Sequence, residues 1–322
     1  MLFNFTQQAV SQVSALKVIP EVQHFDGKKG TYTLPSSVQI TVNTEKNDSL
    51  MSIAMQLKEE LHTMFQIEAN VDTTSATTAS SANEILIAYS QGSLKNSEGY
   101  TLNLNAASGV TIQGVARDGA FWATRTLLQL AENHNNSIPT GLITDFPDYP
   151  NRGFMIDVGR KFFTIDYLRD YVKILSYYKM NEFHVHLNDN GCKSYYDNYW
   201  SKTYAAFRLE SDTYPGLAAK DGHYTKEEFR NLQLLGMQYG VNVIPEIDIP
   251  AHSLSFTRYK PELEASAPYA QDHLDILDDE KLPIVYDFFD KLFDEYIKGD
   301  NPTFIGPDVH VGTDEFIKEG AG

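Results

Sequence analysis

The last strand-like segment of the sequence ends in two adjacent carboxylic acids. The motif HVGTDE covers residues 310–315, so Asp314 and Glu315 are direct neighbours. Their like charges repel, and the charge of one, together with any burial, should raise the pKa of the other. A carboxyl whose pKa is raised can act as a general acid near neutral pH. The alternative reading is an acidic turn or helix start that is exposed to solvent.

The adjacency of the two acids restricts the mechanism they could support. In ordinary retaining glycosidases, two carboxyls stand about 5–5.5 Å apart on either side of the bond that breaks. Successive Cα atoms lie about 3.8 Å apart, and side chains in an extended strand diverge. Neighbouring acids are therefore poorly placed to flank one bond. One of them could donate a proton while the other positions a different part of the substrate.

Polar residues also gather at the carboxyl ends of three earlier segments that read as buried strands. They are Asp157 and Arg160, His186 and Asp189, and Glu246 and Asp248. The carboxyl ends of parallel strands gather on one side of an α/β fold, where such folds place their active sites. We therefore expect one site formed by four strand ends.

Strands and helices alternate in the part of the chain that must position these residues. Strands are expected at 153–158, 182–187, 241–247 and 308–312, and helices at 165–178, 226–239 and 282–297. Thr225 and Glu228 form a capping box at the start of the second helix, and Gly240 closes its end. The alternation predicts an α/β fold with a parallel sheet and right-handed crossovers.

Residues 1–150 show a different pattern. Strands are expected at 38–42, 84–89, 100–105 and 110–113, helices at 50–65 and 118–131, and a polar loop at 73–83. This order is typical of a small α+β domain. The proline-rich segment DFPDYPN at 145–151 should cross between two domains, because residues before proline are pushed toward extended conformations.

The chain resembles glycoside hydrolase family 20, the β-N-acetylhexosaminidase and lacto-N-biosidase family. The similar segments are RGFMIDVGRKFF at 152–163, NEFHVHLND at 181–189, VIPEIDIPAHS at 243–253 and HVGTDE at 310–315, with GVTIQGVARDGAFWATRTLLQL at 109–130. The resemblance implies an N-terminal α+β domain at 1–150. It implies that residues 151–322 are the first half of a catalytic (β/α)8 TIM barrel, with about four β/α units.

The resemblance also implies a reaction. It would be the retaining, substrate-assisted removal of a terminal β-linked N-acetylhexosamine from a glycan, with the sugar's own 2-acetamido oxygen as nucleophile. Glu315 would be the general acid, and Asp314 would orient the acetamido group. His252 and Asp189 match a polar pair that supports the acid. No cofactor and no metal are implied.

Four further residues match substrate-side positions of the family motifs. Arg160 would hold sugar hydroxyls through its forked guanidinium, or form a structural ion pair with an acid. His186, Asp248 and Glu246 would bind the substrate or support the site.

Three alternatives to this activity stay open. The chain reads NDNGCK at 188–193 where many family members read DDQGW, and this form is similar to the lacto-N-biosidase branch, which releases a disaccharide. His184 and His186 face the same side of a strand and could bind a metal in a metal-dependent barrel hydrolase. The chain could also be a non-catalytic carbohydrate-binding fragment.

The connection after the second barrel strand, residues 188–223, is long for a loop between a strand and a helix. It is rich in aromatic residues: Tyr195, Tyr199, Trp200, Phe207 and Tyr214 among them. Aromatic faces stack on sugar rings, so a subsite for the rest of the glycan is one interpretation. The other is a loop that packs on itself.

Composition excludes several classes of protein. The 322 residues hold 26 Lys and Arg against 43 Asp and Glu, a net charge of −17. This balance argues against binding nucleic acid or anionic lipid. The lone Cys192 excludes an internal disulfide framework. No apolar run is long enough for membrane insertion, and the first twenty residues do not read as a signal peptide.

Two further expectations concern the number of residues available for the barrel and the cellular location of the protein. An eight-stranded barrel needs about 250 residues, more than the chain supplies after Arg152. We therefore expect the missing barrel half to come from the same or another chain, because four parallel strands alone leave open edges. Secretion or a bacterial surface location, with the signal removed, and a cytoplasmic location are both compatible with the sequence.

Overall fold

The computed structural model describes residues 16–43, 49–90, 92 and 94–318. The segment considered as a possible signal peptide lies mostly outside these residues. The chain separates into two compact units: residues 1–150 with Tyr177–Lys179, and residues 151–176 with 180–322. Among the described residues, no helix combines the length and the apolar character needed to cross a membrane.

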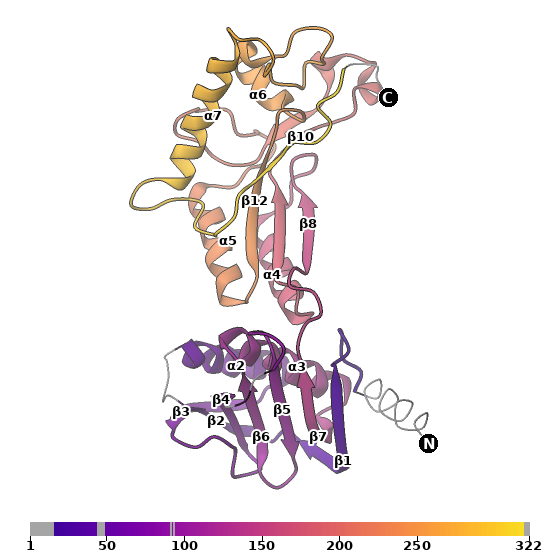
Figure 1. The fold of residues 1–322 in the computed structure, drawn as a ribbon, viewed down its shortest axis with the longest axis vertical. Coiled ribbons are helices and arrows are strands. Elements are labelled where there is room, and N and C mark those ends of the chain that lie inside the picture. The colour runs from indigo at the N-terminus through magenta and orange to yellow at the C-terminus, as the bar shows by residue number, and fades with distance from the viewer. Residues whose placement is uncertain (1–15, 44–48, 91, 93, 319–322) are drawn as a thin grey trace. The chain divides into compact units, whose positions relative to one another are not determined.

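The first unit is a seven-stranded mixed sheet with two helices on one face (Figure 1). The strand order is β1-β7-β5-β6-β4-β2-β3. The strands are β1 His24–Thr33, β2 Ser37–Asn43, β3 Glu68–Thr74, β4 Glu84–Tyr89, β5 Tyr100–Asn105, β6 Gly109–Gly114 and β7 Ser137–Asp145. The helices are α2 Ser49–Phe65 and α3 Arg117–Asn133.

The core of this unit lies between the sheet and its helices. Leu50, Ile53, Leu57 and Leu61 recur on one face of α2 and are fully or almost fully buried. The stripe follows from their spacing of three and four residues, which places them on the same side of a helix.

Three strands of this sheet, the edge strands β1 and β3 and the interior strand β7, were not expected from the sequence. The prediction contained β2, β4, β5 and β6 but not β1, β3 or β7, and β3 extends two residues into the predicted loop at 73–83. β1 carries the glycines Gly27 and Gly30, and β3 reads EANVDTT, so neither has the apolar alternation by which a half-buried strand is recognised.

The second unit contains a four-stranded, all-parallel sheet of order β13-β12-β9-β8. The strands are β8 Gly153–Asp157, β9 Glu182–His186, β12 Asn242–Ile249 and β13 His310–Gly312. Its main helices are α4 Ile165–Tyr177, α5 Lys226–Gln238 and α7 Leu282–Ile297 (Figure 1). The predicted alternation of strands and helices is present within the described residues.

Shorter elements fill the connections of the second unit. The long loop after β9 forms a small antiparallel hairpin, β10 Asn188–Asn190 with β11 Ala205–Phe207. It also contains the 3-10 turns η1 Lys193–Tyr196 and η2 Trp200–Lys202. A helix absent from the prediction, α6 Leu254–Tyr259, follows β12 and precedes the turn η3 Pro261–Leu263.

The predicted cap of α5 is present. The Thr225 hydroxyl accepts from the Glu228 backbone N–H, and the Glu228 carboxylate accepts from the Thr225 N–H at 2.9 Å. Two backbone donors at the helix start are thereby satisfied.

The two edges of the parallel sheet carry exposed apolar side chains. Phe154 and Met155 on β8 are 40% and 53% exposed, and Val311 on β13 is 41% exposed. Within the described residues, β8 and β13 each pair with a single strand of this sheet. No closed barrel is present in the described part of the chain.

Candidate active site

The carboxyl ends of the four parallel strands surround one cavity of about 460 Å³. Every site residue predicted from the sequence lines it: Glu315, Asp314, His252, Asp189, Arg160, His186, Asp248 and Glu246. The parallel register explains this convergence, because it aligns Asp157 with His186 and His186 with Glu246, and Glu246 in turn with His310.

The adjacent acids lie just beyond β13 and face the cavity. The side chains of Asp314 and Glu315 are 66% and 69% exposed, so a ligand could reach both. His252 Nε2 lies 3.2 Å from Glu315 Oε2 and 3.8 Å from Asp314 Oδ2. The shorter contact makes Glu315 the acid that is tied to the histidine.

His252 is itself held by Asp189. The ring Nδ1 lies 2.9 Å from Asp189 Oδ1. Burial opposes charge on this ring, but the hydrogen bond and the charge of Asp189 outweigh it and raise the pKa of His252 to about 9. Burial likewise opposes ionisation of Asp189, yet hydrogen bonds from His186 and His252 lower its pKa to about 2. The site therefore contains a charged imidazole in contact with Glu315 at neutral pH.

Arg160 both forms ion pairs and remains accessible. Its guanidinium contacts Asp157 Oδ2 at 2.9 Å and Asp189 Oδ2 at 2.6 Å, and its Nε donates to the Asn190 carbonyl. The side chain is 49% exposed and lines the cavity. The structural ion pairs anticipated as an alternative are thus present, and they orient a guanidinium whose exposed part can meet a ligand.

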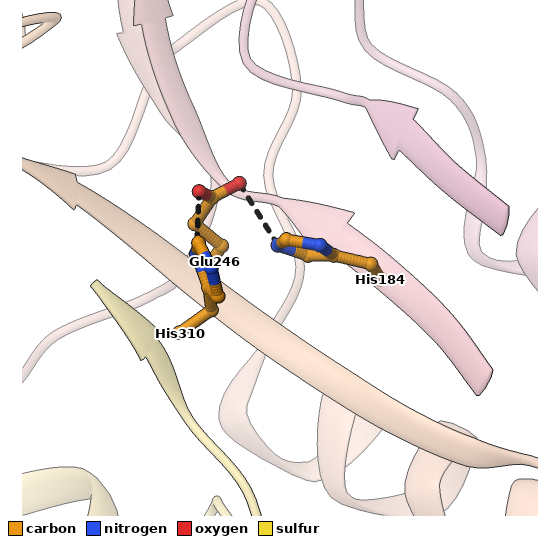
Figure 2. A group of neighbouring side chains, drawn as sticks. All are labelled: His184, Glu246 and His310. Carbon is orange, nitrogen blue, oxygen red and sulfur yellow. Dashed lines mark hydrogen bonds and ion pairs between the residues drawn. The ribbon is translucent and has the colours of Figure 1, made fainter. Parts of the chain in front are cut away.

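Glu246 contacts three histidines, His184, His186 and His310, and Figure 2 shows it with His184 and His310. His310 Nδ1 is 2.8 Å from its Oε1, and His186 Nδ1 is 2.5 Å from its Oε2. His184 Nε2 is 3.0 Å from Oε2 but does not meet hydrogen-bond geometry there, and the atom is buried. Burial opposes ionisation of Glu246, but its histidine contacts hold the pKa of this carboxyl well below its usual range.

His186 and Glu246 are largely occupied by protein partners. Both ring nitrogens of His186 face carboxylates, Glu246 on one side and Asp189 at 2.8 Å on the other. Burial opposes charge on His186, but these two bonds raise its pKa to about 10. Direct substrate binding by either residue stays a prediction, and support of the site is what their contacts favour.

The same cluster could supply metal ligands. His184, Glu246 and His310 offer two nitrogens and an oxygen close together, a combination that zinc accepts. The sequence suggests His184 and His186 as a pair of possible metal ligands. In the structure, the possible ligand set that contains His184 is completed by Glu246 and His310. Both Glu246 oxygens already accept hydrogen bonds from imidazoles, Oε1 from His310 and Oε2 from His186, whereas the buried His184 Nε2 makes no hydrogen bond within the described residues.

Asp248 is the carboxyl whose ionisation is suppressed. It is 2% exposed, and burial, opposed by the charge of His252, raises its pKa to about 7 with a contribution from Asp314. Its Oδ1 accepts from the Thr313 N–H at 3.2 Å. Asp248 thus contacts the backbone of the segment directly before Asp314 and Glu315.

Two supporting residues are missed by sequence reasoning. The Asn188 amide bonds the Asp248 N–H and carbonyl as well as the His252 carbonyl. Arg208 is completely buried and donates to the Val158 and Gly159 carbonyls, directly before Arg160. An arginine in an apolar segment, AAFRLES, is the one local signal that could have marked the second of these.

The aromatic loop is partly packed and partly open. Phe207 is buried, and Tyr214 stacks on Phe288 at 4.1 Å between ring centroids, while Tyr195 is 86% exposed and Tyr199 58%. Self-packing therefore accounts for some of the aromatic residues. A glycan subsite formed by the exposed ones stays a prediction. Cys192, in the same loop, is exposed and free.

The fold and site define a class: a mixed α+β unit followed by a parallel α/β unit with acids at its strand ends. Residues 15–146 match glycosyl hydrolase family 20 domain 2, and residues 149–320 match the catalytic domain of that family. The chain belongs to glycosyl hydrolase family 20.

Relatives of known name agree with this membership. A β-hexosaminidase of Akkermansia muciniphila is 34% identical over 64% of this chain and 44% of its own length. A β-hexosaminidase of Porphyromonas gingivalis is 26% identical over 94% of this chain and 39% of its own. The chain thus spans less than half the length of these two relatives.

Solved structures share the fold. The family 20 exo-β-N-acetylglucosaminidase of Vibrio harveyi, in complex with N-acetylglucosamine, superposes with a TM-score of 0.71 at 21% identity. The match covers 95% of this chain and 48% of the Vibrio chain. At this identity the likeness concerns the fold rather than the substrate.

Proposed function

We propose that the protein is a retaining β-N-acetylhexosaminidase that removes a terminal β-linked N-acetylhexosamine from a glycan. The observation that carries this proposal is the exposed Asp314 and Glu315 pair, with Glu315 tied to the His252–Asp189 pair. The related β-hexosaminidases support the reaction class.

In the proposed first step, the carbonyl oxygen of the substrate's 2-acetamido group attacks the anomeric carbon and the glycosidic C–O bond breaks. Glu315 donates its proton to the departing oxygen. Asp314 accepts a hydrogen bond from the acetamido N–H and stabilises the positive oxazolinium-like intermediate. This division of labour suits neighbouring acids, which are poorly placed to flank one bond.

In the second step, Glu315 takes a proton from water as the water oxygen attacks the anomeric carbon. The acetamido group is released, and the product keeps the β configuration. His252 carries positive charge at neutral pH. It therefore stabilises the carboxylate that Glu315 becomes after the first step. Arg160 offers the exposed part of its guanidinium to sugar hydroxyls.

We further propose that β8, β9, β12 and β13 are four successive strands of a (β/α)8 barrel. Their parallel order and the exposed apolar residues at both sheet edges support this architecture. Hydrolysis by residues 1–322 alone, at the rate of a chain extended to the length of its relatives, would contradict the requirement for further strands.

The activity is tested with chromogenic glycosides of N-acetylglucosamine, N-acetylgalactosamine and lacto-N-biose in parallel, using the protein in its full natural length. Release from either monosaccharide glycoside supports the proposal. Release from lacto-N-biose alone identifies the biosidase, which the NDNGCK segment at 188–193 keeps as the second candidate. No hydrolysis of any of the three contradicts both.

A further inference from the structure

A histidine outside the family motifs contacts the backbone of Glu315. His273 lies in the loop between η3 and α7 and is 5% exposed. Its Nε2 is 3.1 Å from the Glu315 carbonyl oxygen, and its Nδ1 is 2.8 Å from Asp272 Oδ1. Because a carbonyl oxygen only accepts, Nε2 is the donor in the first contact. The second contact fixes the plane of the ring.

Asp272 continues this connection to the opposite side of the site. Its Oδ2 accepts from the Asn190 side-chain amide at 3.1 Å. The Asn190 N–H donates to Asp189 at 2.7 Å, and its carbonyl accepts from Arg160 at 3.1 Å. Strand β10, whose Asn190 carbonyl accepts from Arg160, is therefore joined through Asp272 and His273 to the backbone of Glu315, the proposed acid.

Glu315 is thus held at two points, and the contacts from both lead back to strand β10. Its carboxylate contacts His252, which contacts Asp189, the residue next to Asn190. Its carbonyl contacts His273, which reaches Asn190 through Asp272. The polar contacts form a closed ring in which the carboxylate and the carbonyl of one residue are fixed independently.

The segment that carries Glu315 needs such support. Thr313 has φ +86° and Glu315 has φ +51°, a left-handed conformation that costs free energy for residues other than glycine. Beyond Glu315, Phe316 stacks on Tyr269 at 4.7 Å, and Tyr269 forms an isolated β-bridge with Lys318. The loop that supplies His273 therefore holds this segment along several residues.

We propose that Asp272 and His273 are positioning residues that hold the Glu315 backbone and so aim its carboxyl at the glycosidic oxygen. This inference rests on the proposed role of Glu315 as general acid. Displacing a catalytic group by about 1 Å can cost about 100-fold in rate, so loss of the His273 contact should weaken proton donation.

The test compares His273→Ala and His273→Gln with wild type on two sets of N-acetylglucosaminides. One set has acidic phenol leaving groups, which depart without much protonation, and the other has alkyl alcohols, which need the acid. We expect His273→Ala to lose roughly 10- to 100-fold in kcat/KM on the alkyl set and several-fold less on the phenol set. His273→Gln keeps an N–H donor and should recover most of the loss.

A matched control is His223→Ala, since His223 Nδ1 also lies 2.9 Å from a backbone carbonyl, that of Ala219, away from the cavity. Equal losses on both substrate sets in His273→Ala, or no loss, would overturn the positioning role. A wild-type protein inactive on both sets would instead contradict the proposed function.

Hydrogen exchange supplies a readout that does not depend on activity. In His273→Ala, amide exchange across residues 313–316 should accelerate, while in His223→Ala it should match wild type. Unchanged exchange in His273→Ala would also overturn the inference. If His273→Ala does not fold, Asp272→Asn takes its place as the disrupting variant, because Asp272 Oδ1 contacts the His273 ring, and His273→Gln remains the conservative comparison.

Discussion

At the scale of single residues, the carboxyl groups of the site are separated by their surroundings. Asp314 and Glu315 are exposed to the cavity, whereas Asp189 and Glu246 are buried and held ionised by histidines. Asp248 is buried without enough compensating positive charge, so its pKa is raised. The carboxyl groups that line this one cavity therefore differ in role. The exposed pair is placed to meet a substrate, and the buried ionised pair orients histidines. Asp248 supports the site and can take up a proton.

The replacement Glu315→Gln should lower kcat on a chromogenic N-acetylglucosaminide by about 10²–10⁴-fold, because the amide cannot donate the proton. Steady-state kinetics on the protein in its full natural length measure this effect. Asp290→Asn, on the exposed face of α7, provides a control with the same chemical change. Wild-type rates in Glu315→Gln would show that another residue is the acid.

Asp248 should make stability fall as pH rises. Its pKa is about 7 in the folded protein and near 3.8 when unperturbed, so the folded state binds the extra proton between these values. Unfolding free energy relative to Asp248→Asn should therefore decrease from pH 5 to pH 7, by up to about 1.4 kcal/mol per pH unit. Urea denaturation of both proteins at each pH gives this difference. A difference that does not vary with pH would contradict the burial of an ionisable Asp248.

The sequence indicated the principal site residues but not their supports. Asp189, His252 and Glu315 come from separate motifs at strand ends, and parallel register brings such ends together by rule. Asp272 and His273 lie in a loop, and the path of a loop cannot be predicted from the spacing of apolar residues, as that of a helix or strand can. Their contacts with Asn190 and Glu315 join residues far apart in the chain, and only the folded loop reveals them.

At the scale of elements, strands were predictable where burial imposes a pattern. β9 and β12 are central in the parallel sheet. β9 reads EFHVH, with apolar and polar residues alternating, and β12 reads NVIPEIDI, with a branched apolar residue at four of its eight positions. β1 and β3, at the edges of the other sheet, are largely exposed and carry few apolar residues, so their pairing depends on neighbours that the local sequence does not specify.

The cap of α5 offers a test at this scale. Thr225→Ala should destabilise the second unit by about 1 kcal/mol, because the N–H of Glu228 loses its acceptor at the helix start. Thr63→Ala is the control: its exposed hydroxyl bonds the Glu59 carbonyl within α2, where alanine is a better helix former. Chemical denaturation monitored separately for each unit should show the loss in Thr225→Ala only. If the second unit of Thr225→Ala is as stable as that of the wild type, the contribution of the cap is contradicted.

At the scale of the whole molecule, the negative charge of −17 is compatible with a neutral glycan, which requires no electrostatic capture. The charges that matter for the site are few, and they are paired: Arg160 with Asp157 and Asp189, and the histidines with Glu246. The proposed chemistry runs entirely on protein groups and the substrate's acetamide.

Prolonged treatment of the protein with a chelator should therefore leave hydrolysis unchanged. The reason is that both oxygens of Glu246 already contact imidazoles, His310 at Oε1 and His186 at Oε2. Activity assays before and after dialysis against EDTA, together with metal analysis of the purified protein, check this expectation. Stoichiometric zinc and a loss of activity that added zinc restores would favour the metal-dependent alternative, with His184, Glu246 and His310 as ligands.

Gly312 places an unusual limit on sequence variation. A Cβ atom at this position would lie 1.6 Å from Asp248 Oδ1, and the residue has φ +64°. The left-handed backbone disfavours any residue with a Cβ atom, and the buried Asp248 carboxyl occupies the space that a methyl group would need. In a library containing every amino acid at position 312, selection for activity should return glycine alone. Recovery of alanine at wild-type frequency would show that the carboxylate and strand end can move apart.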